Sequence, residues 1–96
     1  MTYQLHVEKQ ASTDIAIAAL EYEDQRLGLG LDFLDKIDAL FARIVQSPFQ
    51  FPCVEGDVRR ALMPRFPYGI YFVPEAKWVV VRAVLHLHRH PDAWKR

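Results

Sequence analysis

The chain has 96 residues, of which 51% are hydrophobic, so its composition is that of a folded protein and not of a disordered one. A chain of this length is expected to form one domain over residues 1–96. Its single cysteine excludes an internal disulfide framework, and no apolar run approaches the roughly 18 residues of a membrane span. Because residues 1–10 lack the charged-then-apolar pattern of an export signal, we expect a small cytoplasmic protein with no membrane partner.

The formal net charge of zero conceals an uneven distribution. Residues 1–56 contain nine acidic and four basic side chains, whereas residues 57–96 contain three acidic and eight basic ones. Such asymmetry is typical of proteins that present different surfaces to different partners. The alternative is a chance difference between the surfaces of helices and strands.

The first third of the chain predicts a strand followed by a helix. Residues 3–7 alternate apolar and polar side chains, which is the period of a half-buried strand. Residues 13–27 are rich in alanine and predict a helix, with Ser12 or Thr13 as N-cap and Gly28 as a left-handed C-cap. Its inner face is expected to contain Ile15, Ala18, Ala19 and Tyr22.

Residues 31–46 give the clearest helix signal. Apolar side chains recur there at spacings of three and four, namely Phe33, Ile37, Leu40, Phe41 and Ile44. Prolines at positions 48 and 52 end the pattern. Because the link to the preceding helix is short, the two helices are predicted to form an antiparallel hairpin.

The remainder of the chain predicts three strands, at 58–63, 68–73 and 78–86, separated by turns at 64–67 and 74–77. On the last strand we expect one wholly apolar face, formed by Val79, Val81, Ala83 and Leu85. The order β-α-α-β-β-β predicts an α+β fold, in which a helical hairpin packs on a small, twisted, mostly antiparallel sheet.

A series of short segments resembles the RelE/ParE family of type II toxins, the toxic halves of bacterial toxin–antitoxin pairs. These segments are residues 19–30, Phe33 with Ile37-Asp38, Ser47-Pro48, Phe51-Pro52, 58–62, 65–72, 83–86 and 89–94. They occur in the family's order from the first predicted helix to the end of the chain, and it is the series that carries the resemblance. The fold of this family is a helical hairpin over a small antiparallel sheet.

The family contains two mechanisms. RelE-like members cleave messenger RNA on the ribosome without a metal, using basic side chains on the sheet and a tyrosine near the C-terminus. ParE-like members lack that set and poison DNA gyrase. Here Arg59 or Arg60 falls near the family's basic pair, and Arg89 matches its basic position after the last strand. Gly69, however, stands in place of an arginine.

The C-terminal tyrosine of the RelE-like members is also absent, and Trp94 or Lys95 stands near its position. A tryptophan cannot transfer a proton, because its one polar group is a weak N–H donor. The resemblance therefore implies a ParE-like toxin with no catalytic residue. The alternative is a ribosome-dependent endoribonuclease that would use Arg59, Arg60 and Arg89.

The resemblance implies two binding surfaces and two partners, a cognate ParD-like antitoxin and DNA gyrase. The surface for the target is expected to be basic and to include Arg59, Arg60, Arg65, Arg82, His86, Arg89 and Trp94. The antitoxin is expected to bind apolar positions of the hairpin, namely Leu20, Tyr22 and Leu27. A binding module without toxicity is a further possibility, and Trp94 could instead fold back to seal the sheet.

No cofactor is expected. His86, His88 and His90 alternate, and on an extended chain such a series could bind zinc or copper. We expect solvated histidines and no metal site, because no carboxylate or cysteine converges on them. His86 alone matches the family pattern, as a residue that packs at the end of a strand or, alternatively, as a general base.

Overall fold

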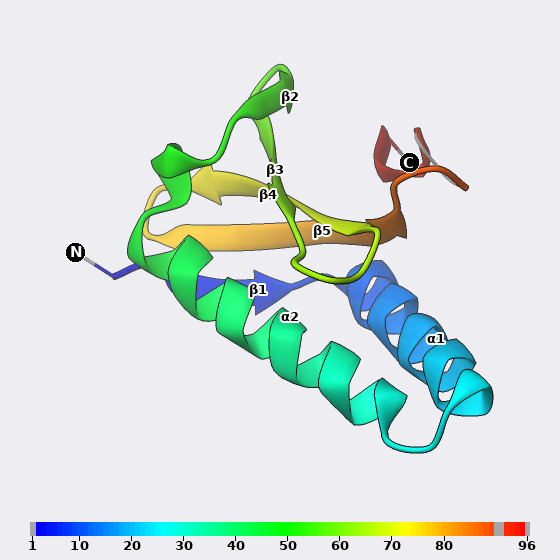
Figure 1. The fold of residues 1–96 in the computed structure, drawn as a ribbon. Coiled ribbons are helices and arrows are strands. Elements are labelled where there is room, and N and C mark those ends of the chain that lie inside the picture. The colour runs from blue at the N-terminus through cyan, green and yellow to red at the C-terminus, as the bar shows by residue number, and fades with distance from the viewer. Residues whose placement is uncertain (1, 90–91, 96) are drawn as a thin grey trace.

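Two helices cover one face of a five-stranded sheet in the computed structural model, which describes residues 2–89 and 92–95 (Figure 1). The elements are β1 (Gln4–Val7), α1 (Lys9–Gln25), α2 (Leu29–Gln46), the 3₁₀ turn η1 (Pro48–Gln50), β2 (Cys53–Glu55), β3 (Val58–Leu62), β4 (Tyr68–Glu75), β5 (Trp78–His86) and the 3₁₀ turn η2 (Ala93–Lys95). The spatial order is β1-β5-β4-β3-β2, parallel between β1 and β5 and antiparallel elsewhere. The predicted α+β fold is confirmed.

The sequence does not predict β2. This strand has three residues, and its register with β3 shifts between Cys53 and Glu55. A segment this short is below the length at which alternation can be recognised.

Helix α1 begins at Lys9, four residues before the predicted start. Glu8 is its N-cap, and its backbone N–H donates to the Val81 carbonyl of β5 at 3.0 Å, so the chain passes from the sheet directly into the helix. Thr13 is not a cap, because its hydroxyl donates to the Lys9 carbonyl at 3.1 Å inside the helix.

Two glycines make the turn between the helices. Gly28 has the expected left-handed backbone, with φ 87°, but it is the N-cap of α2, and α1 has its C-cap at Arg26. The N–H groups of Gly28 and Gly30 both donate to the Glu23 carboxylate, at 3.0 Å each. Gly30 is buried within α2, and a Cβ there would lie 2.7 Å from the carbonyl oxygen of Ala19. Only glycine therefore allows α1 and α2 to approach this closely.

The inner face of the sheet packs on the helices. The stripe predicted on α2 is confirmed, because Phe33, Ile37, Leu40 and Ile44 are buried and Phe41 is half-buried. They join a core cluster with side chains from α1 and the sheet, among them Ala18, Ile70, Phe72, Val79, Val81 and Val84.

A β-bulge changes which face the end of β5 presents. Tyr71 pairs with Ala83 but the next residue, Phe72, pairs with Val81, so Arg82 is an extra residue without a partner in β4. The prediction of one apolar face on this strand is therefore wrong. Val79 and Val81 lie in the inner core, whereas Ala83 and Leu85 lie on the outer face.

A second, smaller cluster lies on the outer face of the sheet, the face turned away from the helices. Its buried members are Val58, Tyr71, Val73, Ala83, Leu85 and Trp94. Trp94, from η2, stacks on Tyr71 with 5.6 Å between ring centroids and 9° between planes. Across residues 2–89 and 92–95, no helix has both the length and the hydropathy to span a bilayer.

Candidate functional site

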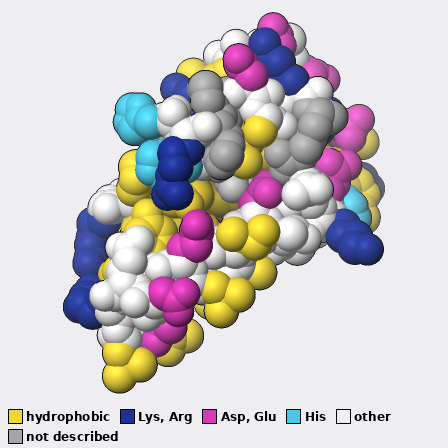
Figure 2. Space-filling view, turned by 90° about the vertical axis from the view of Figure 1, so that its right-hand side faces the viewer, with side chains coloured by type: hydrophobic (Ala, Val, Ile, Leu, Met, Phe, Trp, Pro, Cys, Tyr) yellow, Lys and Arg dark blue, Asp and Glu magenta, His cyan; other side chains and the backbone are white. Residues whose placement is uncertain are grey.

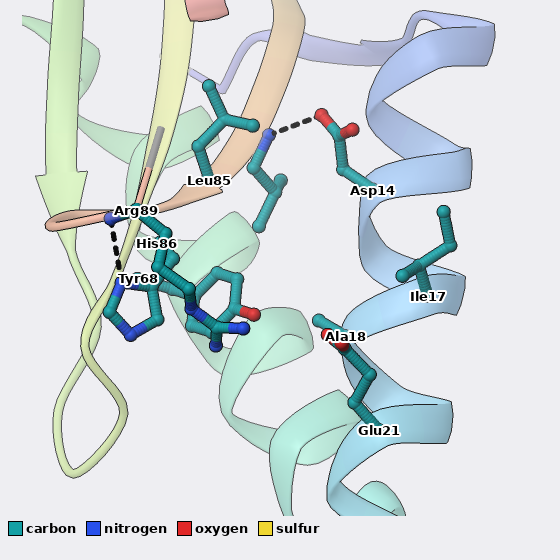
Figure 3. A pocket seen from close by; sticks show the side chains of 9 residues that line it. Asp14, Ile17, Ala18, Glu21, Tyr68, Leu85, His86 and Arg89 are labelled. Carbon is teal, nitrogen blue, oxygen red and sulfur yellow. Dashed lines mark hydrogen bonds between the residues drawn. The ribbon is translucent and has the colours of Figure 1, made fainter. Parts of the chain in front are cut away.

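A hollow of about 180 Å³ lies between α1 and the end of β5 (Figure 3). Four of its lining residues are on α1 and the others are on β4, β5 and the turn that follows β5: Asp14, Ile17, Ala18, Glu21, Tyr68, Val84, Leu85, His86 and Arg89. Two of these, His86 and Arg89, are among the residues expected to contact the target. We call this hollow the α1–β5 pocket.

The pocket forms where β1 stops covering β5. The pairing of β1 with β5 ends at Val7 and Val81, and α1 then occupies the edge of β5. There the backbone N–H of Val84, which a neighbouring strand would otherwise bind, donates to Oδ2 of Asp14 at 3.0 Å. Helix α1 thus supplies a side-chain acceptor in place of a strand.

His86 holds the turn after β5. Its Nδ1 accepts hydrogen bonds from the backbone N–H groups of His88 and Arg89, at 3.1 and 3.3 Å, so the neutral imidazole carries its hydrogen on Nε2. The ring also meets Tyr68 edge-on, with centroids 5.3 Å apart. These contacts fix the backbone of the turn, and in Figure 3 the Arg89 side chain runs from this turn toward Tyr68.

Two phenols lie close to the Arg89 charge. Burial raises the pKa of Tyr68 and of Tyr22 above the ordinary value, and the positive charge of Arg89 partly opposes both increases. In the described part of the chain, Arg89 forms no ion pair. Its guanidinium thus places a positive charge near these phenols, in a pocket that Asp14 and Glu21 also line.

The other expected target residues do not converge on this pocket. Nη1 of Arg59 donates to the Phe51 carbonyl at 2.6 Å, and its guanidinium lies 4.8 Å from the Phe49 ring centroid. Arg65 is exposed in the β3–β4 turn with φ 68°, and the bulged Arg82 approaches Glu8 at 3.9 Å.

Arg60 lies on the outer face of the sheet, opposite Tyr71. A Cβ at Gly69 would be 3.1 Å from Cδ of Arg60 and 3.1 Å from Cδ2 of Leu87, so the glycine makes room for the stem of this arginine. Nε of Arg60 is buried without a hydrogen-bond partner. Trp94 is on the same face, is 9% exposed and packs its ring on Tyr71, and its contact with the target stays a prediction.

The hairpin exposes several large apolar side chains. Leu20 is 68% exposed, Leu27 is 90% exposed, and two residues that the sequence analysis did not single out, Ile17 and Leu31, are 54% and 66% exposed. A groove of about 250 Å³ between the helices is lined by Ala19, Leu20, Glu23, Gly30, Leu31 and Leu34. Figure 2 shows hydrophobic side chains beside acidic ones over this end of the molecule.

Tyr22 does not belong to this exposed surface. Its ring is half-buried and lies 4.9 Å from the Phe66 ring and 5.4 Å from the Phe33 ring, measured between centroids. Tyr22 therefore lies on the inner face of α1, as the sequence predicts, and its ring completes the aromatic part of the core. Its contact with an antitoxin stays a prediction.

Of the predicted histidine series, His86 and His88 have ring centroids 5.9 Å apart, while His90 lies outside the described residues. Among the residues that the structure describes, no group of three His, Cys, Asp or Glu side chains could hold a metal ion.

Asp14, Glu21 and Tyr68 are pocket residues that sequence reasoning missed. A signal existed for Asp14, because it lies three residues after Ala11 and four before Ala18, the two buried residues of α1. An acid on the buried face of a helix indicates a partner in the core.

Comparisons with known proteins give a match in structure and none in sequence. Neither a family model nor a curated protein matches the chain. A solved chain from the chromosomal ParDE TA system from P. aeruginosa superposes with a TM-score of 0.76 at 18% identity, over 88% of this chain and 96% of that one. At this identity the likeness establishes a shared fold.

Proposed function

We propose that this chain is the toxin of a type II toxin–antitoxin pair, inhibits bacterial growth by poisoning DNA gyrase, and is neutralised by a ParD-like antitoxin in the cytoplasm. The observation that carries the proposal is the fold match, which covers almost the whole of a chain from a toxin–antitoxin system. The family resemblance of segments 58–62, 65–72 and 89–94 supports it independently.

The exposed leucines of the hairpin support an antitoxin partner. Leu20 and Leu31 line the inter-helix groove, and Leu27 is exposed in the turn that joins the two helices. Exposed apolar side chains of this kind are typical of a protein-binding surface. An amphipathic helix could place apolar anchors there at spacings of three and four.

The positions of the arginines favour action on gyrase over ribonuclease activity. Phosphoryl transfer needs several cations around one phosphate. Arg59 is bound to the Phe51 carbonyl, Arg60 lies on the outer face and Arg89 lines the pocket beside α1, so these three side chains surround no common point. Gly69 in turn provides space for the Arg60 stem and contributes no cation.

Inducible expression in a bacterial host, with and without the neighbouring reading frame, tests the proposal. We expect growth arrest, filamentation and a DNA damage response with intact mRNA, and rescue by the neighbouring frame. Purified protein should inhibit supercoiling by gyrase. Rapid cleavage of ribosome-bound mRNA would favour the endoribonuclease instead, and unimpaired growth of cells that contain the folded protein would contradict both.

Variants of the hairpin test the antitoxin surface. Leu20→Ser with Leu31→Ser should abolish co-purification with the antitoxin and leave toxicity intact, because both side chains are already exposed in the free protein. Leu5→Ser is the matched control, since Leu5 is an exposed leucine on β1. Loss of binding in the control alone would place the antitoxin at the sheet edge.

A further inference from the structure

The α1–β5 pocket separates charge of opposite sign. Arg89 lies on one side, beside Tyr68, whereas Asp14 and Glu21 lie on α1 across the hollow (Figure 3). Neither acid forms an ion pair with Arg89, and the Asp14 carboxylate accepts the Val84 N–H at 3.0 Å. The Arg89 charge is therefore available to a ligand.

Apolar side chains make up part of the surface between these charges. Ile17 and Ala18 line the pocket from α1, and Val84 and Leu85 line it from β5. A cavity of about 150 Å³ can hold a benzene ring, so the hollow of about 180 Å³ has room for one aromatic or branched group.

The backbone of Arg89 is held by the turn, and its side chain is exposed. His86 accepts two backbone N–H groups of the turn, including that of Arg89 at 3.3 Å. Arg89 and Tyr68 line the same hollow, and the Arg89 charge opposes the rise in pKa that burial causes at Tyr22 and Tyr68. A planar guanidinium and a phenolic O–H can both donate to one carboxylate.

From this geometry we infer that the α1–β5 pocket binds a carboxylate carried on an aromatic or branched apolar group. The carboxylate accepts hydrogen bonds from Arg89 and Tyr68, and the apolar group lies against Ile17 and Ala18 of α1. His86 is a positioning residue that fixes the turn. The inference goes beyond the proposed function and does not depend on toxicity.

Three probes of similar shape and different charge test the inference: 3-phenylpropionate, 3-phenylpropionamide and 3-phenylpropylamine. Each is titrated into the ¹⁵N-labelled protein, and shifts are followed at Val84, Leu85 and the Arg89 side-chain Nε–H. We expect the carboxylate to bind about fivefold to tenfold more tightly than the amide, because its hydrogen bonds to Arg89 are charge-assisted. Tightest binding of the ammonium probe, or equal binding of all three, would overturn the inference.

Two substitutions at Arg89 separate charge from geometry. Arg89→Gln should lower the affinity for the carboxylate to that for the amide, and Arg89→Lys should restore part of the difference, because lysine keeps the charge without the planar fork. Arg65→Gln is the matched control, since Arg65 lies in an exposed turn away from the pocket. An unchanged preference in a folded Arg89→Gln protein would contradict the inference.

The role of His86 is tested by His86→Asn and His86→Leu. Asparagine offers a carbonyl oxygen as acceptor for the turn N–H groups and should keep most of the preference for the carboxylate, whereas leucine should remove it. Equal loss in both folded variants would exclude the positioning role.

A dipeptide pair identifies the source of the carboxylate. If acetyl-Phe-Asp-amide binds more tightly than phenylpropionate and acetyl-Phe-Asn-amide does not, the ligand is an acidic peptide. The reverse order indicates a small molecule, and both results support the shared chemistry.

Discussion

The two faces of the sheet are closed in different ways. The inner face is covered by α1 and α2, and its core includes side chains from both helices and from β3, β4 and β5. The outer face has a smaller cluster, which is closed by one aromatic ring on a short C-terminal turn. The inner face therefore determines whether the chain folds, whereas the outer face determines whether the C-terminal segment stays docked.

The largest loss in the free energy of unfolding is expected from a substitution on the inner face. Phe33 is fully buried, with ring centroids 5.3 Å from Phe66 and 5.2 Å from Tyr68. Phe33→Ala should lower the free energy of unfolding by about 3–5 kcal/mol, a large part of the roughly 5–15 kcal/mol typical of a small domain. Urea denaturation measures this loss, and a change below about 1 kcal/mol would show that the inner face does not control folding.

A smaller loss in the free energy of unfolding is expected from a substitution on the outer face. Trp94→Ala should cost about 2 kcal/mol, because the ring covers the cluster from one side only and lies near the chain end. Trp94→Phe should recover about half of this loss through stacking on Tyr71. Denaturation curves combined with growth assays distinguish the two roles of Trp94. Toxicity that falls only in step with stability assigns it to sealing the sheet, and lost toxicity at unchanged stability assigns it to the target.

Alkaline pH should lower the stability of the protein through the inner core and not through the outer cluster. Burial raises the pKa of Tyr22 and Tyr68 above the ordinary value of 10.0, so folding favours their neutral forms. The stability that these two neutral phenols contribute is complete below pH 10.0. It is lost as the pH rises through their higher pKa values in the folded protein. Tyr68→Phe should flatten the alkaline fall in melting temperature relative to the wild type. An identical fall in both proteins would locate the effect elsewhere.

The smallest effect is expected from the ion pair that joins the C-terminal turn to β2. Nζ of Lys95 lies 3.7 Å from Oε1 of Glu55, and both side chains are about half exposed. Glu55→Gln should change the free energy of unfolding by less than about 0.5 kcal/mol, because exposed pairs are screened by water and salt. A loss equal to that of Trp94→Ala would mean that charge, and not stacking, holds this turn.

Periodic features were the ones that the sequence could predict. The buried stripe of α2 and the order of the elements follow from spacing, which depends on local geometry alone. The start of α1 was missed because it depends on a long-range bond, from the Glu8 N–H to the carbonyl of Val81. The bulge at Arg82 was missed because alternation along one strand carries no information about its neighbour's register.

For the candidate site, too, the sequence could predict the residues that belong to a local pattern and not those that only the fold brings together. His86 and Arg89 stood out because they match a family pattern, whereas Asp14 and Tyr68 join them only through contacts between distant segments. The exposure of Leu31 likewise depends on how the hairpin lies on the sheet.

The bulge at Arg82 acts as a phase shift in the side-chain alternation of β5. Residues before it and after it follow the same two-residue period, but with opposite parity, so Val84 and His86 face α1 while Ala83 and Leu85 face Trp94. Deleting this single residue would leave the pairs Phe72–Val81 and Tyr71–Ala83 in regular succession, so both sets would keep their faces. If Arg82 instead paired with Tyr71, the two sets would exchange faces, His86 would lie on the outer face, and the α1–β5 pocket would lose one wall.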